Sequence, residues 1–171
     1  MKIGIDIDDT LVSSSESFNE LRKRYNINFS KNWKDEWTQD ERDFIFKNYL
    51  NEILKGAKIK ENAKEVLDEL NRQGHEIIVI TARTEKNCAG IEEYTKKYLK
   101  DNNIKVSKYY FAQYKKSDIA KKIKLDLMVD DSLDVYKNMK KDKINCILFG
   151  DKIKTWKEVL EYIKDKEVKN G

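Results

Sequence analysis

The chain of 171 residues contains no proline, six glycines, two cysteines and one histidine. The scarcity of proline and glycine excludes collagen-like proteins and Pro/Gly-rich low-complexity proteins. No stretch approaches the run of about 18 uncharged apolar residues that a membrane-spanning helix needs. Aromatic residues make up 11% of the chain, which is too many for a disordered protein despite a charged content of 39%. The composition therefore predicts one folded domain, or one domain with a small insertion.

The two cysteines, Cys88 and Cys146, form neither a CxxC pair nor the spacing of a zinc site. The first carboxylate, Asp6, comes too early for a secretory signal peptide. We therefore expect a cytoplasmic protein in which both thiols are reduced packing residues.

The net charge of the chain is +4, and lysines are concentrated between Lys96 and Lys124. Tyr94, Tyr98 and Leu99 supply an apolar stripe among these charges, which favours a solvated helical surface. Attraction of an anionic substrate is the alternative interpretation of this basic segment.

Short apolar runs alternate with amphipathic stretches along the chain. The runs predict strands at residues 2–7, 76–81, 105–111, 125–129 and 144–149. Helical periodicity predicts helices at residues 59–73, 91–102, 118–124, 133–140 and 155–164, with Ser117 as an N-cap. This alternation predicts an α/β fold in which helices cover both faces of a Rossmann-like parallel sheet. We expect residues 166–171 to fray and His75 to lie in a surface turn.

Residues 15–57 break the alternation, because no strand pattern follows there. The segment looks helical and contains several aromatic residues, which form either a small core or a stacking surface for a substrate: Phe18, Trp33, Trp37, Phe44, Phe46 and Tyr49. We expect an α/β core at residues 1–14 and 58–171, with a small helical cap inserted at residues 15–57.

Polar residues gather where the expected strands end. They are Asp6, Asp8, Asp9 and Thr10 after the first strand, Thr81, Ala82 and Arg83 after the second, Lys115 and Lys116 before a helix, and Asp130 and Asp131 after the fourth. Ligands of open parallel sheets bind at the carboxyl ends of the strands, so we expect these residues to share one site. Helix capping is the alternative role for a single acid such as Asp9.

Asp6 and Asp8 are two residues apart on a strand, so their side chains point to the same face. Neighbouring carboxylates remain ionised only beside a cation. Together with Asp130 and Asp131 they form an oxygen-rich pocket typical of Mg²⁺, and the absence of histidine and cysteine from the motif disfavours zinc and copper. Mg²⁺ beside a carboxylate and a lysine indicates phosphoryl transfer, in which an aspartate can attack phosphorus and a second acid can move protons.

The segment Asp6-Ile7-Asp8-Asp9-Thr10-Leu11 resembles the first motif of the haloacid dehalogenase superfamily. The apolar run that ends at Thr81 is similar to the second motif, Lys116 in Lys116-Ser117-Asp118 to the third, and Val129-Asp130-Asp131 to the fourth. The four motifs occur in the family's order and span nearly the whole chain. Thr81-Ala82-Arg83, the insertion, and the segment from Phe149 to Leu160 resemble the narrower 5′(3′)-deoxyribonucleotidase family and its bacterial relatives.

The resemblance implies a role for each motif residue. Asp6 would be the catalytic nucleophile and a metal ligand. Asp8 would be the catalytic acid and base, would be held by Thr10, and would give its main-chain oxygen to the metal. Asp131 would be the third metal ligand, with Asp130 as the alternative.

The resemblance also implies a phosphate-binding side of the site. Thr10, Thr81, the Ala82 amide, Arg83 and Lys116 are the substrate-side residues. Lys115 is the alternative to Lys116, and Arg83 either touches the substrate or pairs with an acid.

The implied activity is that of a Mg²⁺-dependent phosphomonoesterase with an aspartyl-phosphate intermediate. The implied substrate is a small-molecule phosphomonoester, and the implied enzyme is a 5′-nucleotidase acting on (deoxy)nucleoside monophosphates. The alternatives are a phosphatase of sugar phosphates or of nucleic-acid ends, and a non-enzymatic module that binds metal and phosphate. Neither a membrane nor a nucleic acid is the expected partner.

Overall fold

The computed structural model describes residues 1–27 and 38–170. The described residues form a parallel sheet with the strand order β3-β2-β1-β4-β5. The strands are β1 (Lys2–Ile5), β2 (Glu76–Ile80), β3 (Lys108–Tyr110), β4 (Leu127–Asp130) and β5 (Asn145–Leu148). The predicted α/β fold with a parallel sheet is therefore confirmed.

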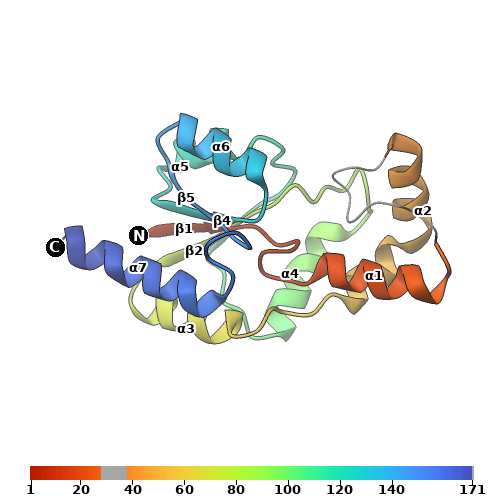
Figure 1. Cartoon of the computed structure of the whole chain (residues 1–171), viewed down its shortest axis with the longest axis horizontal. Helices are drawn as coiled ribbons and strands as arrows, with labels where there is room; N and C mark the ends of the chain where they lie inside the picture. Colours follow the sequence, from red (N-terminus) through yellow and green to blue (C-terminus); the bar gives the residue numbers. More distant parts are fainter. Residues whose placement is uncertain (28–37, 171) are drawn as a thin grey trace.

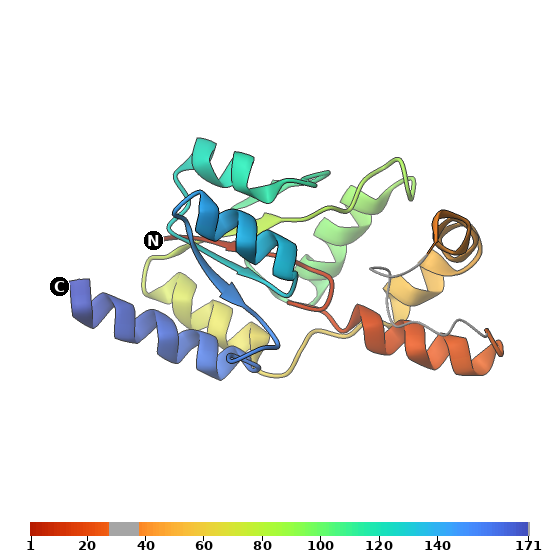
Figure 2. The ribbon, with the colours of Figure 1, turned by 45° about the horizontal axis from the view of Figure 1, so that its top comes forward.

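Helices cover both faces of this sheet (Figures 1 and 2). One face packs against α3 (Ala63–Arg72), α4 (Ile91–Asp101) and α7 (Trp156–Asn170), and the other against α5 (Lys116–Ile123) and α6 (Leu133–Lys141). Alternate residues of β2 enter the two cores: Ile77 and Val79 on one side, Ile78 and Ile80 on the other. Burial of both strand faces explains the uninterrupted apolar run in the sequence.

Two helices begin elsewhere than their patterns predict. The helix expected from residue 59 begins at Ala63, because Ile59 forms an antiparallel bridge with Val12 and so belongs to an extended segment. The helix expected from residue 118 begins at Lys116. Ser117 therefore lies inside the first turn of α5, and its predicted role as an N-cap is wrong.

The C-terminal segment and His75 also differ from expectation. Helix α7 continues to Asn170, beyond the helix end predicted at residue 164. The His75 ring is buried rather than placed in a surface turn. Its Nδ1 lies 3.1 Å from the amino group of Met1, and its Nε2 lies 3.4 Å from Glu167 of α7. The longer helix places this carboxylate beside the imidazole.

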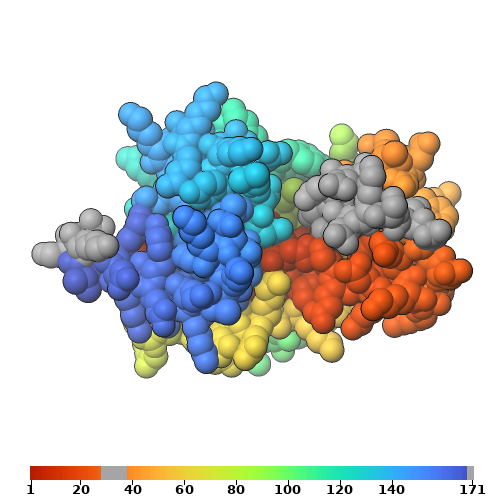
Figure 3. Space-filling view, in the orientation of Figure 1, coloured from red at the N-terminus to blue at the C-terminus, as the bar shows by residue number. Residues whose placement is uncertain are grey.

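The expected insertion holds α1 (Ser14–Arg24), which begins one residue before the expected boundary, and α2 (Gln39–Gly56). Both helices lie at one end of the molecule (Figures 1 and 3). These helices pack through the buried side chains of Phe18, Leu21, Ile45 and Ile53. Phe18 is thus a core residue. Trp33 and Trp37 lie outside the described residues.

The two chain segments that connect these helices to the sheet run side by side. The Ser13 amide donates to the Lys58 carbonyl at 2.9 Å, and the Lys58 amide donates to the Ser13 hydroxyl at 3.1 Å. The connection is therefore a short hydrogen-bonded pair of segments. Across the described ranges, no helix is both long enough and apolar enough to span a bilayer.

Candidate active site

Three adjacent strands deliver polar residues to one edge of the sheet. Asp6 follows β1, Thr81 follows β2, and Asp130 ends β4. The strand order reverses direction around β1, which is where parallel α/β sheets bind ligands. A cavity of about 280 Å³ opens at this edge. Its wall includes these motif residues: Asp6, Asp8, Thr81, Ala82, Arg83, Lys116, Asp130 and Asp131.

The ammonium group of Lys116 lies between two carboxylates. It donates to Oδ1 of Asp6 at 2.5 Å and to Oδ2 of Asp130 at 2.7 Å. The Lys116 side chain is only 5% exposed. Helix α5 begins at Lys116, so the position of the helix on the sheet determines where the ammonium points.

Burial and charge act in opposite directions on these groups. Burial alone would lower the pKa of Lys116, but the charges of Asp6 and Asp130 outweigh it and raise this pKa. Burial and the charge of Asp6 raise the pKa of Asp130 to about 6, although Lys116 opposes the shift. Lys116 therefore remains a fixed positive charge beside Asp6.

Carboxylate oxygens of Asp6, Asp130 and Asp131 lie within 4.8 Å of one another. Oxygen donors at this spacing suit a hard divalent cation. Asp8 adds a fourth carboxylate to the cavity wall, and among the described residues these four acids outnumber the three cations of the same wall, Arg42, Arg83 and Lys116. The cluster thus has the donors and the excess negative charge that a metal ion requires.

Thr10 does not line the cavity but holds Asp131 in place. Its hydroxyl donates to Oδ1 of Asp131 at 3.0 Å and accepts from the Asp131 amide at 3.0 Å. The indole of Trp156 in α7 donates to the Thr10 carbonyl at 3.1 Å. The expectation that Thr10 holds Asp8 is not what the structure shows, because the turn after β1 brings Thr10 against the end of β4.

Asp8 accepts hydrogen bonds from Ser14 and Arg83. The Ser14 hydroxyl donates to its Oδ1 at 2.5 Å, and Arg83 donates to both carboxylate oxygens at 2.8 and 3.0 Å. Of the two roles open to Arg83 in the sequence, pairing with an acid is therefore the one observed. Burial opposes the charged form of Arg83, but Asp8 outweighs this effect and raises the pKa of the guanidinium.

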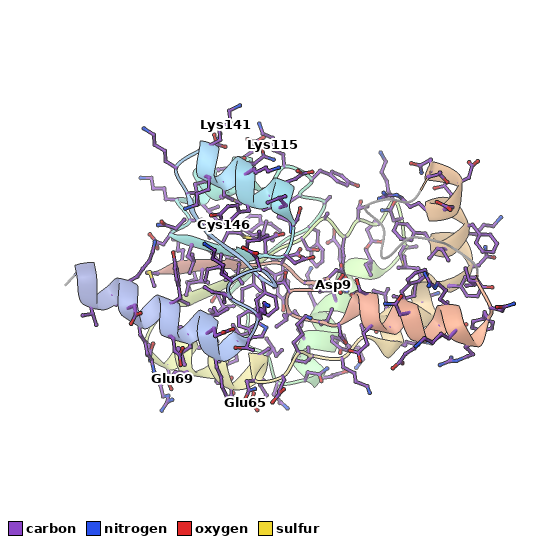
Figure 4. All side chains as sticks on the ribbon, in the orientation of Figure 1. Asp9, Glu65, Glu69, Lys115, Lys141 and Cys146 are labelled. Atoms are coloured by element: carbon purple, nitrogen blue, oxygen red, sulfur yellow. The ribbon has the colours of Figure 1, made fainter. Side chains whose placement is uncertain are left out.

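Asp9 belongs to the connection with α1 (Figure 4). Its carboxylate accepts from the Ser15 amide at 2.7 Å and from the Ser15 hydroxyl at 2.6 Å. Asp9 has a positive φ of 65°, which the sharp turn after β1 requires. Asp9 thus accepts from an amide in the first turn of α1, which agrees with the helix-capping role considered for this acid.

Lys115 and Lys116 have different environments. Lys115 pairs with Asp118 at 3.2 Å on the surface, and its side chain is 64% exposed (Figure 4). Of the two, Lys116 is the lysine that lines the cavity.

The two cysteines also differ, although both are free thiols. Cys146 is buried, and burial raises the pKa of its thiol to about 12. Cys88 is partly buried and lies on the cavity wall. The packing role expected for both thiols thus describes Cys146 better than Cys88.

Sequence reasoning missed the wall that faces the motif residues. Helix α2 and the loops after β2 and β3 supply this wall: Arg42, Phe46, Leu50, Ile53, Leu54, Asn87, Gln113 and Tyr114. Apolar spacing in α2 marks a packed helix face but does not indicate which residues reach the sheet edge. Of the expected stacking aromatics that the structure describes, Phe46 is the one that lies on the cavity wall.

Comparisons with known proteins agree with this architecture. No protein-family model matches the chain. A Bacillus cereus protein described as a "putative nucleotidase" is 28% identical over 96% of this chain and 98% of its own length.

Solved structures share the fold at low sequence identity. A haloacid dehalogenase-like hydrolase from Streptococcus pneumoniae superposes with a TM-score of 0.65 at 14% identity, covering 95% of this chain and 97% of that one. A "predicted phosphatase" from Clostridium acetobutylicum gives a TM-score of 0.58 at 13% identity, covering 96% and 98%. With four motifs at one sheet edge and the architecture shared along nearly its whole length, the chain has the fold of the haloacid dehalogenase superfamily, as its motifs predicted.

Proposed function

We propose that the protein is a Mg²⁺-dependent phosphomonoesterase that forms a phosphoryl intermediate on Asp6. The observation that carries this proposal is the placement of Asp6 in a cavity, 2.5 Å from the Lys116 ammonium and within the acidic cluster. A carboxylate next to fixed positive charge is suited to attack a phosphate ester, because that charge balances the incoming anion.

In the first step, a carboxylate oxygen of Asp6 attacks phosphorus and the bond to the ester oxygen breaks. The Asp8 carboxyl gives its proton to the departing alcohol. In the second step, a water gives a proton to Asp8 and attacks the same phosphorus, and the bond to Asp6 breaks to release inorganic phosphate. Thr81 and the Ala82 amide line the cavity where they could bind phosphoryl oxygens.

Asp6, Asp131 and the main-chain oxygen of Asp8 are the proposed holders of Mg²⁺, with Asp130 at the edge of the same cluster. Bound Mg²⁺ would supply positive charge for the phosphoryl oxygens. Both carboxylate oxygens of Asp130 already accept hydrogen bonds, from Lys116 and from the Ser132 amide. Because both of its oxygens are engaged, Asp130 is disfavoured as a direct ligand.

A nucleoside monophosphate is the proposed substrate. The Bacillus cereus relative and the aromatic side chain of Phe46 opposite the acids both support it. The basic segment does not favour a nucleic-acid end, because several of its lysines pair with acids of the protein itself. These pairs are Lys97 with Asp101, Lys108 with Glu76, Lys115 with Asp118, and Lys121 with Asp142.

Residues 15–57 are proposed as a cap over this site. Helix α2 supplies one wall of the cavity, while the sheet edge supplies the other. A cap of this kind would exclude water during attack by Asp6 and would select the leaving group.

Phosphate release from p-nitrophenyl phosphate, with and without Mg²⁺, tests the reaction. We expect EDTA to stop turnover and Mg²⁺ to restore it. Asp6→Asn should abolish turnover without unfolding the protein, whereas Asp134→Asn, an exposed acid on α6, should leave it unchanged. A phosphoryl group on the peptide containing Asp6 after acid quenching would support the intermediate. Full activity of Asp6→Asn would exclude it.

A panel of phosphomonoesters tests the substrate class. Nucleoside 5′- and 3′-monophosphates, their deoxy forms, sugar phosphates and 5′-phosphorylated oligonucleotides would be compared by kcat/KM. We expect mononucleotides to give the highest value. A higher kcat/KM for sugar phosphates would contradict the proposed substrate class but would leave the proposed reaction unchanged.

A further inference from the structure

Asp8 is the end of a chain of partly buried polar contacts. Nε and Nη2 of Arg83 donate to Oδ2 and Oδ1 of Asp8 at 3.0 and 2.8 Å. Nη1 of the same guanidinium donates to Oγ1 of Thr95 at 2.9 Å. The side chain of Arg83 is 8% exposed, and Thr95 in α4 is 1% exposed. Because acceptors engage all three nitrogens, the plane of the guanidinium is fixed.

We propose that Arg83, anchored by Thr95, is a positioning residue that sets the direction of the Asp8 carboxyl group for proton transfer. The inference rests on the proposed function, in which Asp8 is the acid and the base. A two-point contact between a guanidinium and a carboxylate fixes the carboxylate plane as well as its position. Thr95 belongs to a helix packed on the sheet, so Asp8 is tied to the core as well as to Ser14 of α1.

Phosphate binding is the competing role for Arg83, which lines the cavity beside Thr81. Two observations favour positioning. Three of the five N–H groups of the guanidinium already donate to Asp8 or Thr95, and Lys116 supplies positive charge next to Asp6. Arg83 therefore acts on the reaction through Asp8.

Steady-state kinetics of Arg83→Met and Arg83→Lys separate the two roles. Misdirection of a proton donor lowers kcat, and we expect a loss of at least about 100-fold for Arg83→Met. The inhibition constant of inorganic phosphate should stay within about threefold of wild type, because phosphate binding does not depend on proton transfer. Arg83→Lys, with a single donor group, should recover only part of kcat.

The leaving group provides a readout that a general loss of structure would not change. The p-nitrophenolate group departs without a proton, whereas an alcohol of an alkyl phosphate needs one. In Arg83→Met, kcat/KM for an alkyl phosphate should fall at least about tenfold more than kcat/KM for p-nitrophenyl phosphate. Asp8→Asn should show the same preference.

Thr95→Val keeps the inference testable if the Arg83 variants do not fold. Thr95 is absent from the cavity wall, so its effect on turnover must pass through Arg83. We expect Thr95→Val to lower kcat by about tenfold with the same leaving-group preference, and Thr95→Ser to restore it.

The inference is overturned if Arg83→Met raises KM and the phosphate inhibition constant at unchanged kcat, or if kcat/KM falls by the same factor for both leaving groups. A crystal structure of Arg83→Met tests it without turnover: the Asp8 carboxyl should turn away from its wild-type direction, and an unmoved carboxyl would contradict the inference. Wild-type protein inactive on every phosphomonoester would instead refute the proposed function.

Discussion

The ammonium nitrogen of Lys116 lies 2.5 Å from Oδ1 of Asp6, although 110 positions separate the two residues in the sequence. The same ammonium contacts Asp130 at 2.7 Å. One buried cation thus holds the ends of β1 and β4 and the start of α5 together. Stability and the proposed activity depend on the same contact.

Replacement of Lys116 by methionine should therefore affect both properties. It would leave two buried carboxylates without their cation, which costs about 3 kcal/mol of the free energy of unfolding. Phosphate release should fall to background. Urea denaturation and a phosphatase assay measure the two effects. Lys115→Met is the matched control: its surface pair with Asp118 is worth little, so a change within about 0.5 kcal/mol is expected. Equal effects of the two substitutions would contradict the assignment of Lys116.

Replacement of Thr10 by valine should weaken the proposed metal site. The substitution keeps the shape of the side chain but removes its hydrogen bonds to the Asp131 carboxylate and amide. Residues that orient a metal ligand typically contribute 10- to 100-fold to metal affinity, so we expect about that loss for Mg²⁺. Calorimetric titration with Mg²⁺ measures it.

Thr155→Val serves as the control for Thr10, because Thr155 is exposed and contacts Glu158 at the start of α7. Its substitution should lower stability slightly and leave Mg²⁺ affinity unchanged. Unaltered Mg²⁺ affinity of Thr10→Val would contradict the proposal that Asp131, as held by Thr10, binds the metal.

Replacement of Gly56 by alanine should loosen the packing of α1 against α2. A Cβ at this position would collide with the Ser17 hydroxyl, which donates to the Ile53 carbonyl at 2.7 Å in a buried site. Overpacking of this kind costs about 1–3 kcal/mol, measurable by thermal or urea unfolding. The double variant Gly56→Ala/Ser17→Ala removes the colliding atom. It should be more stable than the sum of the single effects predicts, and strict additivity would contradict the collision.

The buried His75 should make stability depend on pH. Burial, followed by the charge of the Met1 amino group, lowers the pKa of the imidazole, while Glu167 opposes the shift. The unfolded chain then binds a proton at His75 more readily than the folded chain does. The contribution of this residue to stability is therefore complete above about pH 6.5 and is lost as the pH falls below that value.

Urea unfolding of wild type and His75→Gln between pH 8 and pH 5 measures this contribution. The difference in the free energy of unfolding between the two proteins should shrink as the pH falls. A constant difference across that range would show that His75 titrates alike in the folded and unfolded chains.

Much of the fold follows from local patterns. The run from Ile77 to Ile80 has no polar residue, because both faces of β2 are covered, and this is visible without a structure. Helix boundaries were less predictable. Ile59 fits a helical period but pairs with Val12 in an extended segment, and only the path of the chain between core and α1 reveals this.

In the candidate site, too, some features were predictable from the sequence and others were not. The positions of Asp6, Thr81, Lys116 and Asp130 at strand ends and a helix start were predictable, because each belongs to a short motif beside a recognisable element. The partner of Thr10 was not, since two neighbouring acids satisfy the same hydrogen-bonding chemistry. Thr95 carried no signal at all, because a buried threonine in an amphipathic helix resembles any other packing residue.

The order of apolar runs, and the acids that follow them, specified the parallel sheet and the types of group at its edge, because strand burial and chain direction are local properties. The pairing of those groups was decided only by folding. Asp8 meets Arg83 across 75 positions, and Lys116 reaches Asp6 rather than solvent because α5 packs at one particular place on the sheet. Which charges neutralise one another depends on distances of a few ångströms, and those are created by packing of the whole chain.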